Sequence, residues 1–199
     1  MYEYYFLGET RVPLKLSVQF IAVIGVSAMR QVDFETYVGL NGRFGSHEDI
    51  VYFPDYDMAL IPMAEGCSSV RVDTVDLPAG VYHVPVFSSR ATVGDETLYI
   101  PNGRILVQFE PHIDRETIDV MNDVSSVRIE DEGTILPNTF LLALGGMVPA
   151  DAIYVANRYH VDHRVSFAEP DFIVWVNRPS GLRDGARGTM NRYGSKQAG

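Results

Sequence analysis

The feature that most constrains the fold of this chain is a pattern that occurs twice along it. Residues 16–40 and residues 102–124 each begin with an apolar run of strand type and then continue with Asp, Glu and apolar residues at helical spacing. Two further pairs of segments match in the same order and at a nearly constant offset: 55–66 with 137–148, and 80–89 with 163–172. Three ordered matches indicate a diverged tandem duplication.

The second copy is the more regular one, and its pattern predicts six elements. Strands are expected at 105–110, 127–130, 139–144 and 164–168, with one helix after the N-cap residue Asp114 and another whose first turn holds Pro149. The resulting order, β-α-β-β-α-β, is the ferredoxin-like plan, in which both helices lie on one face of an antiparallel sheet. The opposite face must then be solvated or covered by another body.

The first copy departs from this order in places. A helix is expected at 27–38, whereas 68–80 alternates between apolar and polar residues and fits a strand as well as a second helix. Additional strands are expected within YEYYF near the N-terminus and at 12–18. The sequence therefore predicts an α+β fold with two tandem ferredoxin-like (β-α-β-β-α-β) antiparallel sheets, each with its helices on one face.

The charge of the chain changes at its C-terminal end. The 199 residues carry a formal net charge of −10, but from Trp175 onward five basic residues stand against one acidic residue, a net of +4. Glycine and serine are also frequent there. We therefore interpret 177–199 as a flexible basic tail or linker, after a diverged ferredoxin-like module at 1–95 and a second domain at 96–176. The acidic remainder argues against non-specific binding of nucleic acid, which needs a basic face.

Targeting signals are not evident in the sequence. The N-terminus lacks the basic and apolar regions of a signal peptide, and no apolar run approaches the ~20 residues of a membrane helix. The expected compartment is the cytoplasm, or the extracellular space if a signal had been removed. Cys67 is the only cysteine, so no intrachain disulfide is expected.

Motifs of catalytic or metal chemistry are also missing from the sequence. His160 and His163 lie close together, but no Cys or carboxylate cluster with ligand spacing completes a metal site. No G-x-S-x-G nucleophile motif, GxxxxGK[ST] phosphate loop or G-x-G-x-x-G turn occurs. We therefore expect a protein without enzymatic activity, and we assign it no cofactor and no metal.

The segment RVSFAEPDFIVW, residues 164–175, ends the regular part of the chain in an unusual way. The expected strand is followed by Glu-Pro-Asp and then by four apolar residues, Phe172, Ile173, Val174 and Trp175. An exposed apolar strand invites a partner, so one interpretation places these residues in a complex. In the other interpretation Phe172, Ile173 and Trp175 fold back on the first copy.

The second copy resembles the propeptide of subtilisin-like serine proteases. The resemblance lies in GRILVQFEPHIDRETI at the first strand and helix, in ILPNTFLLAL at the central strand, and in VSFAEPDF at the last strand, of which AEPDF is the most specific part. Over YEYYFLGETRVPLKL and FIAVIG, the first copy resembles the extra amino-terminal module of some bacterial subtilases. No DSG-, HGTH- or GTSMA-like catalytic segment occurs, so the chain is expected to be a processed propeptide or a separate companion of a protease.

The resemblance implies an inhibitor and folding chaperone whose partner is the catalytic domain of a subtilisin-like serine protease, with no nucleic acid and no membrane. In that family the open face of the propeptide sheet packs on two protease helices, and the C-terminal segment lies in the substrate cleft as an added strand. By resemblance, Glu169 and Asp171 cap the N-termini of those helices, where unpaired N–H groups and the dipole favour anions. Phe172, Ile173, Val174 and Trp175 then begin the segment in the cleft.

The alternative function is that of a tandem ferredoxin-like regulatory or scaffold module. Such a module would bind another protein, or a small ligand between its two sheets. The fold plan by itself does not decide between the two functions, because it hosts many unrelated ones.

Overall fold

The computed structural model describes residues 3–29, 31–40, 44–66, 78–88, 96–133 and 136–177. The strands of these residues are β1 (Tyr4–Leu7), β2 (Thr10–Pro13), β3 (Lys15–Ile24), β4 (Val51–Phe53), β5 (Met58–Pro62), β6 (Tyr82–Ser88), β7 (Glu96–Phe109), β8 (Val127–Glu132), β9 (Thr139–Leu144) and β10 (Val165–Asn177). The helices are α1 (Gln31–Leu40), α2 (Arg115–Val124) and α3 (Asp151–His160), and the 3-10 helices are η1 (Val26–Ala28), η2 (His47–Asp49) and η3 (Pro54–Tyr56).

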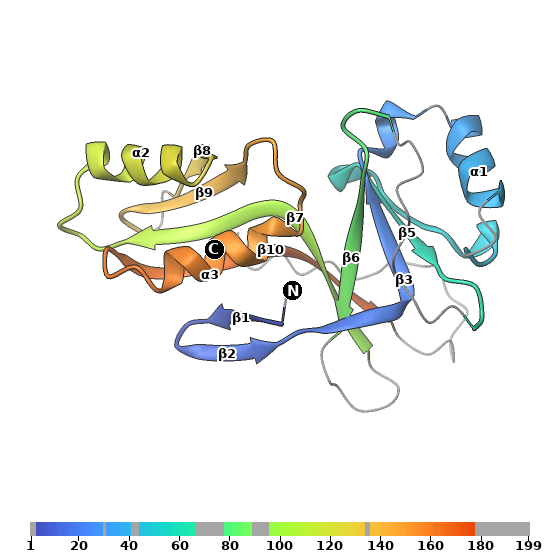
Figure 1. The fold of residues 1–199 in the computed structure, drawn as a ribbon, viewed down its shortest axis with the longest axis horizontal. Helices are drawn as coiled ribbons and strands as arrows, with labels where there is room; N and C mark the ends of the chain where they lie inside the picture. The colour runs from blue at the N-terminus through green and yellow to red at the C-terminus, as the bar shows by residue number, and fades with distance from the viewer. Residues whose placement is uncertain are drawn as a thin grey trace, which may run out of the picture.

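Eight of these strands form one continuous antiparallel sheet (Figure 1). The hydrogen-bonded order is β4-β5-β3-β6-β7-β9-β8, and β10 pairs with β7 along its length. The other two strands, β1 and β2, form a separate hairpin. We refer to β4, β5, β3 and β6 as the N-terminal half of the sheet, and to β8, β9, β7 and β10 as the C-terminal half.

The expected tandem of two ferredoxin-like sheets is wrong. The described chain is largely β-structure built on a single eight-stranded sheet, and only one of its three α-helices, α1, belongs to the N-terminal half. The reason is the length of β7 and β10, which pair from Val165 opposite Phe109 to Asn177 opposite Glu96. Their far ends extend beside the N-terminal half, where β7 also pairs with β6. The sheet therefore runs across the expected domain boundary at 95/96 without a break.

A bulge and an edge position explain why β10 is longer than the strand expected at 164–168. Pro170 lies within β10, which is an edge strand among the described residues, and an edge strand tolerates proline because its outer N–H groups have no strand partner to lose. The register shifts between Asp171 and Phe172, opposite Asn102 and Gly103 of β7. Gly103 has a φ of 84°, in the left-handed region that favours glycine. The β7–β10 ribbon therefore bulges at this point and continues.

The C-terminal half carries α2 and α3 on one face of its sheet. Asp114 caps α2 as expected: its carboxylate accepts a hydrogen bond of 2.8 Å from the Thr117 N–H, and this bond lowers the pKa of Asp114. Side chains of β7, β9 and both helices form one buried cluster on this face, which includes Ile105, Val107, Phe109, Ile118, Met121, Phe140, Leu142, Val155, Ala156 and Tyr159. Val120 and Val124, apolar positions of the same helix, are instead 58% and 73% exposed.

The N-terminal half buries both of its faces. On one face Phe34 and Val38 of α1 pack with Ile21 of β3; the helix begins later than the expected 27–38 because η1 precedes it. The other face holds a cluster made by six strands, namely Ala22, Phe53, Met58, Leu60, Val84, Val86, Leu98, Ile100 and Ile173. Phe20 of β3 contacts Trp175 of β10 beside this cluster, with ring centroids 5.8 Å apart, although β6 and β7 separate these strands in the sheet. The sheet therefore curls around the cluster.

The element expected at 68–80 lies almost entirely outside the described residues.

The β1–β2 hairpin joins the two halves. Tyr5 of β1 is buried together with Phe87 of β6 and Ile153 of α3. Figure 1 shows the hairpin running along α3 and β10, below them in this view. The N-terminal segment, which the sequence assigned to the first copy, is thus packed largely against the second.

Candidate protein-binding surface

The face of the C-terminal half that lies opposite α2 and α3 has an apolar centre. Leu106 of β7 pairs with Leu141 of β9. Phe167 of β10 pairs with Gln108, which lies two residues after Leu106 in β7 and therefore on the same face. Leu106, Leu141 and Phe167 are each half-buried, and among the described residues none of them joins a buried cluster. The sheet therefore presents three large apolar side chains on a face that no described helix covers. We call this the open face.

Charged side chains surround the apolar centre of the open face. The guanidinium Nε of Arg104 lies 2.8 Å from Oε2 of Glu130, and the two side chains are 39% and 36% exposed. Arg128 of β8 is exposed beside Ala143 of β9. An apolar centre within a polar rim is the usual anatomy of a protein–protein interface.

Glu169, the first carboxylate expected at a protease helix, lies on the open face opposite Leu106. Its Oε1 accepts a hydrogen bond of 3.0 Å from the backbone N–H of Gly8, which lies in the turn of the β1–β2 hairpin. The two residues are 161 positions apart in the sequence. The carboxylate is thus held by a backbone N–H from this chain's own N-terminal segment.

Asp171, the second expected carboxylate, lies on the same face opposite Arg104. Its Oδ2 accepts a hydrogen bond of 2.7 Å from the side-chain amide of Asn102. The Oδ1 of Asn102 in turn accepts a hydrogen bond of 3.0 Å from the Arg104 N–H. Asp171 therefore also stabilises the bulge of the β7–β10 ribbon, a contact that the sequence pattern does not indicate.

The apolar residues after Asp171 belong to the protein's own sheet. Ile173 is 2% exposed in the cluster of the N-terminal half, and Trp175 packs against Phe20 at its margin. The Phe172 ring contacts the Tyr5 ring at a centroid distance of 5.1 Å. Ile173 and Trp175 thus fold back on the N-terminal half and Phe172 on β1 in this structure, and Val174 pairs with Tyr99 of β7. One edge of this segment is paired, and the other has no strand partner among the described residues.

The structure therefore brings only part of the expected site together. Glu169 and Asp171 lie with the open face, whereas Phe172 to Trp175 lead away from it into the N-terminal half. Sequence reasoning missed Leu106, Leu141 and Phe167. A signal for Leu106 was present in RILVQF, where it is the apolar residue that breaks the alternation of buried Ile105 and Val107 with polar neighbours.

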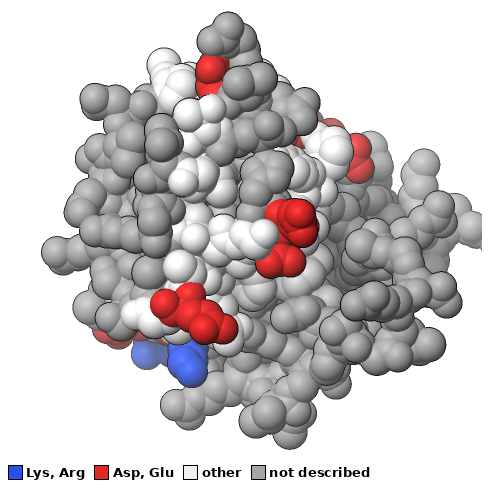
Figure 2. Space-filling model, turned by 90° about the vertical axis from the view of Figure 1, so that its right-hand side faces the viewer, with Lys and Arg blue, Asp and Glu red and all other residues white. Residues whose placement is uncertain are grey.

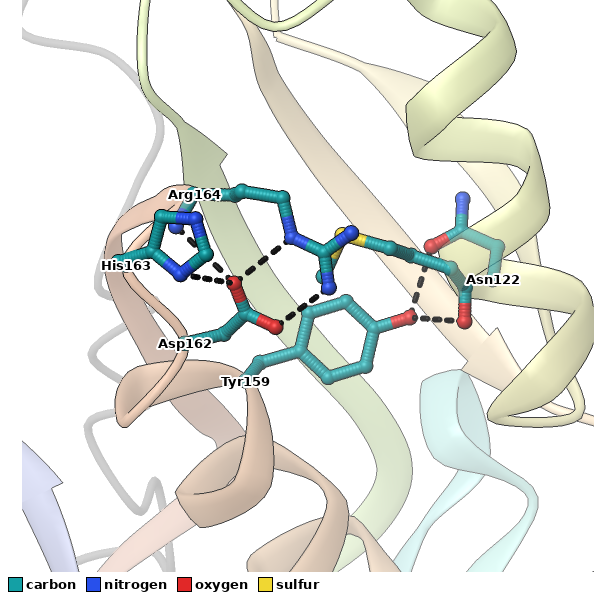
Figure 3. A network of polar contacts seen from close by, with 6 residues as sticks. Asn122, Tyr159, Asp162, His163 and Arg164 are labelled. Carbon is teal, nitrogen blue, oxygen red and sulfur yellow. Dashed lines mark hydrogen bonds and ion pairs between the residues drawn. The ribbon is translucent and has the colours of Figure 1, made fainter.

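The HVDH segment, residues 160–163, forms a polar corner between α3 and β10 (Figure 3). Both carboxylate oxygens of Asp162 bind the Arg164 guanidinium, at 2.8 and 2.7 Å, and this pairing lowers the pKa of Asp162 to about 2. The buried Tyr159 hydroxyl donates to Oδ1 of Asn122 at 2.8 Å, which links α3 to α2. A pocket of about 210 Å³ lies beside this corner and is lined in part by Val120, Val124 and Arg158. The network joins elements and carries no metal-ligand geometry.

The remaining charges and groups give few further indications of function. Figure 2, which views the end of the molecule formed by the N-terminal half, shows mostly acidic side chains among the charged groups described on that face. No group of three or more His, Cys, Asp or Glu side chains placed to ligate a metal ion is found in the described ranges. Within those ranges, too, no helix has the length and apolar character needed to span a membrane.

Comparison with known proteins gives no relative for this chain. No protein-family model matches it, and neither does any curated protein or solved structure.

Proposed function

We propose that this chain is a propeptide-like inhibitor and folding chaperone of a subtilisin-like serine protease, and that it is itself not an enzyme. The observation that carries the proposal is the open face, with its apolar centre of Leu106, Leu141 and Phe167 on the side of the sheet away from α2 and α3. The sequence resemblance in the same segment supplies the kind of partner. Two helices on the surface of the protease catalytic domain pack on this face.

The carboxylates at the edge of the open face add directional contacts. Gly8 engages only Oε1 of Glu169, and Asn102 engages only Oδ2 of Asp171. Since a carboxylate has about four acceptor sites, each group retains capacity for the N–H groups at a helix N-terminus. A contact of this kind contributes about 0.3–1 kcal/mol when exposed. Most of the binding free energy therefore comes from the apolar centre.

The role proposed for Phe172, Ile173, Val174 and Trp175 follows from the edge of β10 that has no hydrogen-bonded strand among the described residues. A strand from the protease cleft adds to this outer edge while the inner edge stays paired with β7. The other edges of the sheet are less suited to such pairing. β8 carries four charged residues and a register shift, and β4 has only three residues. Charges, bulges and short length are the usual protection of sheet edges; residues 172–176 carry no charge, and their register with β7 is regular after the shift at Asp171/Phe172.

Inhibition of the protease tests the proposal directly. The purified chain is added to the catalytic domains of several subtilisin-like proteases, and hydrolysis of a chromogenic peptide is followed. We expect competitive inhibition in the nanomolar range for at least one of them, which is typical of protease–inhibitor pairs. Unchanged activity of every protease with excess protein contradicts the proposal.

Substitutions on the two faces of the C-terminal half locate the binding surface. Leu106→Arg places a charge at the centre of the open face, and we expect it to weaken inhibition on the order of a hundredfold, because burial of an unpaired charge costs several kcal/mol. Val124→Arg, at a position on α2 that is 73% exposed, is the matched control and leaves inhibition unchanged. Equal effects of both variants would place the contact elsewhere.

The chaperone role has its own measurement. A denatured protease domain is diluted into buffer with and without the chain, and the recovered activity is measured after the chain is removed. We expect faster recovery with the wild-type chain than with Leu106→Arg. Equal recovery with and without the chain would leave the inhibitor role and remove the chaperone role.

A further inference from the structure

The β1–β2 hairpin is held firmly on the C-terminal half although it is not part of the main sheet. The side-chain amide of Asn157 on α3 donates a hydrogen bond of 2.9 Å to the carbonyl oxygen of Tyr4. The Phe6 ring stacks on the His160 ring with a centroid distance of 3.8 Å and an angle of 15° between the planes. These contacts fix β1 along α3, and Tyr5 is buried beneath them.

The turn of the hairpin reaches the edge of the open face. Between Leu7 and Thr10 the chain reverses, and the Gly8 N–H points at Glu169 of β10. Leu7 is 51% exposed. Nothing lies within 4 Å of the position that a Cβ on Gly8 would occupy, so this side of the turn is open. An exposed apolar side chain and an unobstructed turn thus stand beside a carboxylate of the proposed surface.

The contact between Gly8 and Glu169 has the chemistry that a helix N-terminus offers, a backbone N–H directed at a carboxylate. It uses one oxygen of Glu169 and fixes the direction of the side chain, so the remaining acceptor capacity is oriented before a partner arrives. Orientation in advance reduces the entropy that is lost when a flexible side chain is immobilised at an interface.

We infer that the turn of the β1–β2 hairpin forms one edge of the protease-binding surface, in which Gly8 positions Glu169 and Leu7 supplies an apolar contact. This inference rests on the proposed function. It gives the N-terminal segment a part in recognition, beyond the packing that holds it on α3. The partner is the same catalytic domain, and the hairpin turn contributes to the choice among related proteases.

The apolar contact is tested with a protease that the wild-type chain inhibits. Leu7→Ser removes the exposed leucine, and we expect inhibition to weaken about five- to tenfold, because half of this side chain remains to be buried. Val124→Ser, on the opposite side of the sheet, is the control and leaves inhibition unchanged. The melting temperatures of both variants stay near that of the wild type. If Leu7→Ser inhibits as well as the control does, the hairpin lies outside the interface.

The positioning of Glu169 is tested with two substitutions of Gly8, whose φ is 53°. Asn tolerates this left-handed conformation and keeps the N–H in place, whereas the β-branched Val does not tolerate it. We expect Gly8→Val to weaken inhibition about two- to fivefold and Gly8→Asn to preserve it. Glu169→Gln should cause a similar loss, and the combination with Gly8→Val should add little to it.

The outcomes separate this inference from the proposed function. Positioning through Gly8 is contradicted if the losses caused by Gly8→Val and Glu169→Gln multiply in the double variant. It is also contradicted if Gly8→Asn fails to preserve inhibition. In both cases, inhibition by the wild-type chain still supports the proposed function. A wild-type chain that inhibits no subtilisin-like protease overturns both.

Discussion

The two halves of the sheet have the same strand order but bury their faces differently. Numbered along the chain, the strands of each half lie in the order second, third, first, fourth: β4-β5-β3-β6 in one and β8-β9-β7-β10 in the other. In the N-terminal half α1 covers one face and the sheet curls around the other. In the C-terminal half α2 and α3 cover one face, while the other keeps Leu106, Leu141 and Phe167 half-buried.

This difference shows that strand order does not determine which surface of a sheet is available to a partner. The N-terminal half completes its second cluster with Leu98 and Ile100 of β7 and Ile173 of β10, which all come from the long ribbon. The described residues provide no equivalent strands for the open face of the C-terminal half. A binding surface therefore arises where the chain has no remaining element to cover the sheet.

The largest expected effect tests whether the two halves unfold together. Ile105 belongs to the buried cluster of the C-terminal half and Ile173 to that of the N-terminal half, with 0% and 2% exposure. We expect Ile105→Ala and Ile173→Ala each to lower the free energy of unfolding by about 2–5 kcal/mol. Since β7 and β10 of the C-terminal half also supply side chains to the buried cluster of the N-terminal half, each variant should unfold in one transition. Far-UV circular dichroism and the fluorescence of Trp175, the only tryptophan, should report the same transition. If Ile105→Ala leaves the Trp175 transition in place, the halves are independent.

Acid is expected to destabilise the whole protein through a buried histidine of the N-terminal half. Burial lowers the pKa of His83 from 6.5 to about 4, and the Tyr37 hydroxyl of α1 is hydrogen-bonded to its Nε2. In the unfolded chain His83 binds a proton near pH 6.5, whereas in the folded chain it does so only near pH 4. The free energy of unfolding therefore falls as the pH drops from about 6.5 to about 4. We expect a loss of about 1–3 kcal/mol, measured by denaturant titration at several pH values. His83→Phe should remove this slope.

The bend of the ribbon that links the halves depends on Gly103. Gly103→Ala places a Cβ on a residue with φ of 84°, and we expect a loss of about 1–2 kcal/mol in the free energy of unfolding. Gly39 lies within α1 with open space around it, so Gly39→Ala should instead stabilise the protein by about 0.5–1 kcal/mol. Changes of the same sign in the two variants would contradict the conformational role of Gly103.

The smallest effect concerns the corner between α3 and β10 in the C-terminal half. Arg164 lowers the pKa of Asp162 to about 2, so the stabilisation is present above pH 4, the range of an unfolded carboxyl group, and is lost as the pH falls toward 2. We expect Asp162→Asn to cost about 1 kcal/mol at pH 7, since a partly exposed ion pair is screened. Asp119→Asn, which breaks the more exposed pair with Arg115, should cost less than half of this. If both variants lose the same stability in thermal unfolding, the two-oxygen contact of Asp162 with Arg164 gives no more stabilisation than the exposed pair of Asp119 with Arg115.

Much of the C-terminal half could be predicted from local patterns. The strand expected at 139–144 is β9, with the same bounds, and Asp114 caps α2 as expected. The strand expected at 164–168 corresponds to the start of β10, which begins at Val165 and runs on to Asn177. That extension could not be predicted from the segment itself, because proline is acceptable in a strand only when no neighbour needs its N–H. Whether a neighbour exists depends on distant residues.

The candidate site shows the same limit. The sequence and its resemblance singled out Glu169 and Asp171, and their protease-binding role stays a prediction. Their partners within the chain, Gly8 and Asn102, lie 161 and 69 positions away, so no local pattern reveals them. The sequence left two interpretations of Phe172, Ile173 and Trp175 open, and in one of them they fold back on the first copy. The position of Ile173 in the buried cluster of the N-terminal half agrees with that interpretation.

The sequence by itself determined the elements whose signals lie within a few residues: the capped helix α2, the apolar strand β9 and the alternation that separates the two faces of β7. These features follow from backbone conformation and from the periodic burial of neighbouring side chains. Only the tertiary structure decided that β7 and β10 join both halves into one sheet and that the β1–β2 hairpin holds Glu169. Such contacts result from competition between distant segments for the same hydrogen-bonding edges and apolar faces, and the outcome of that competition is settled only when the whole chain has packed.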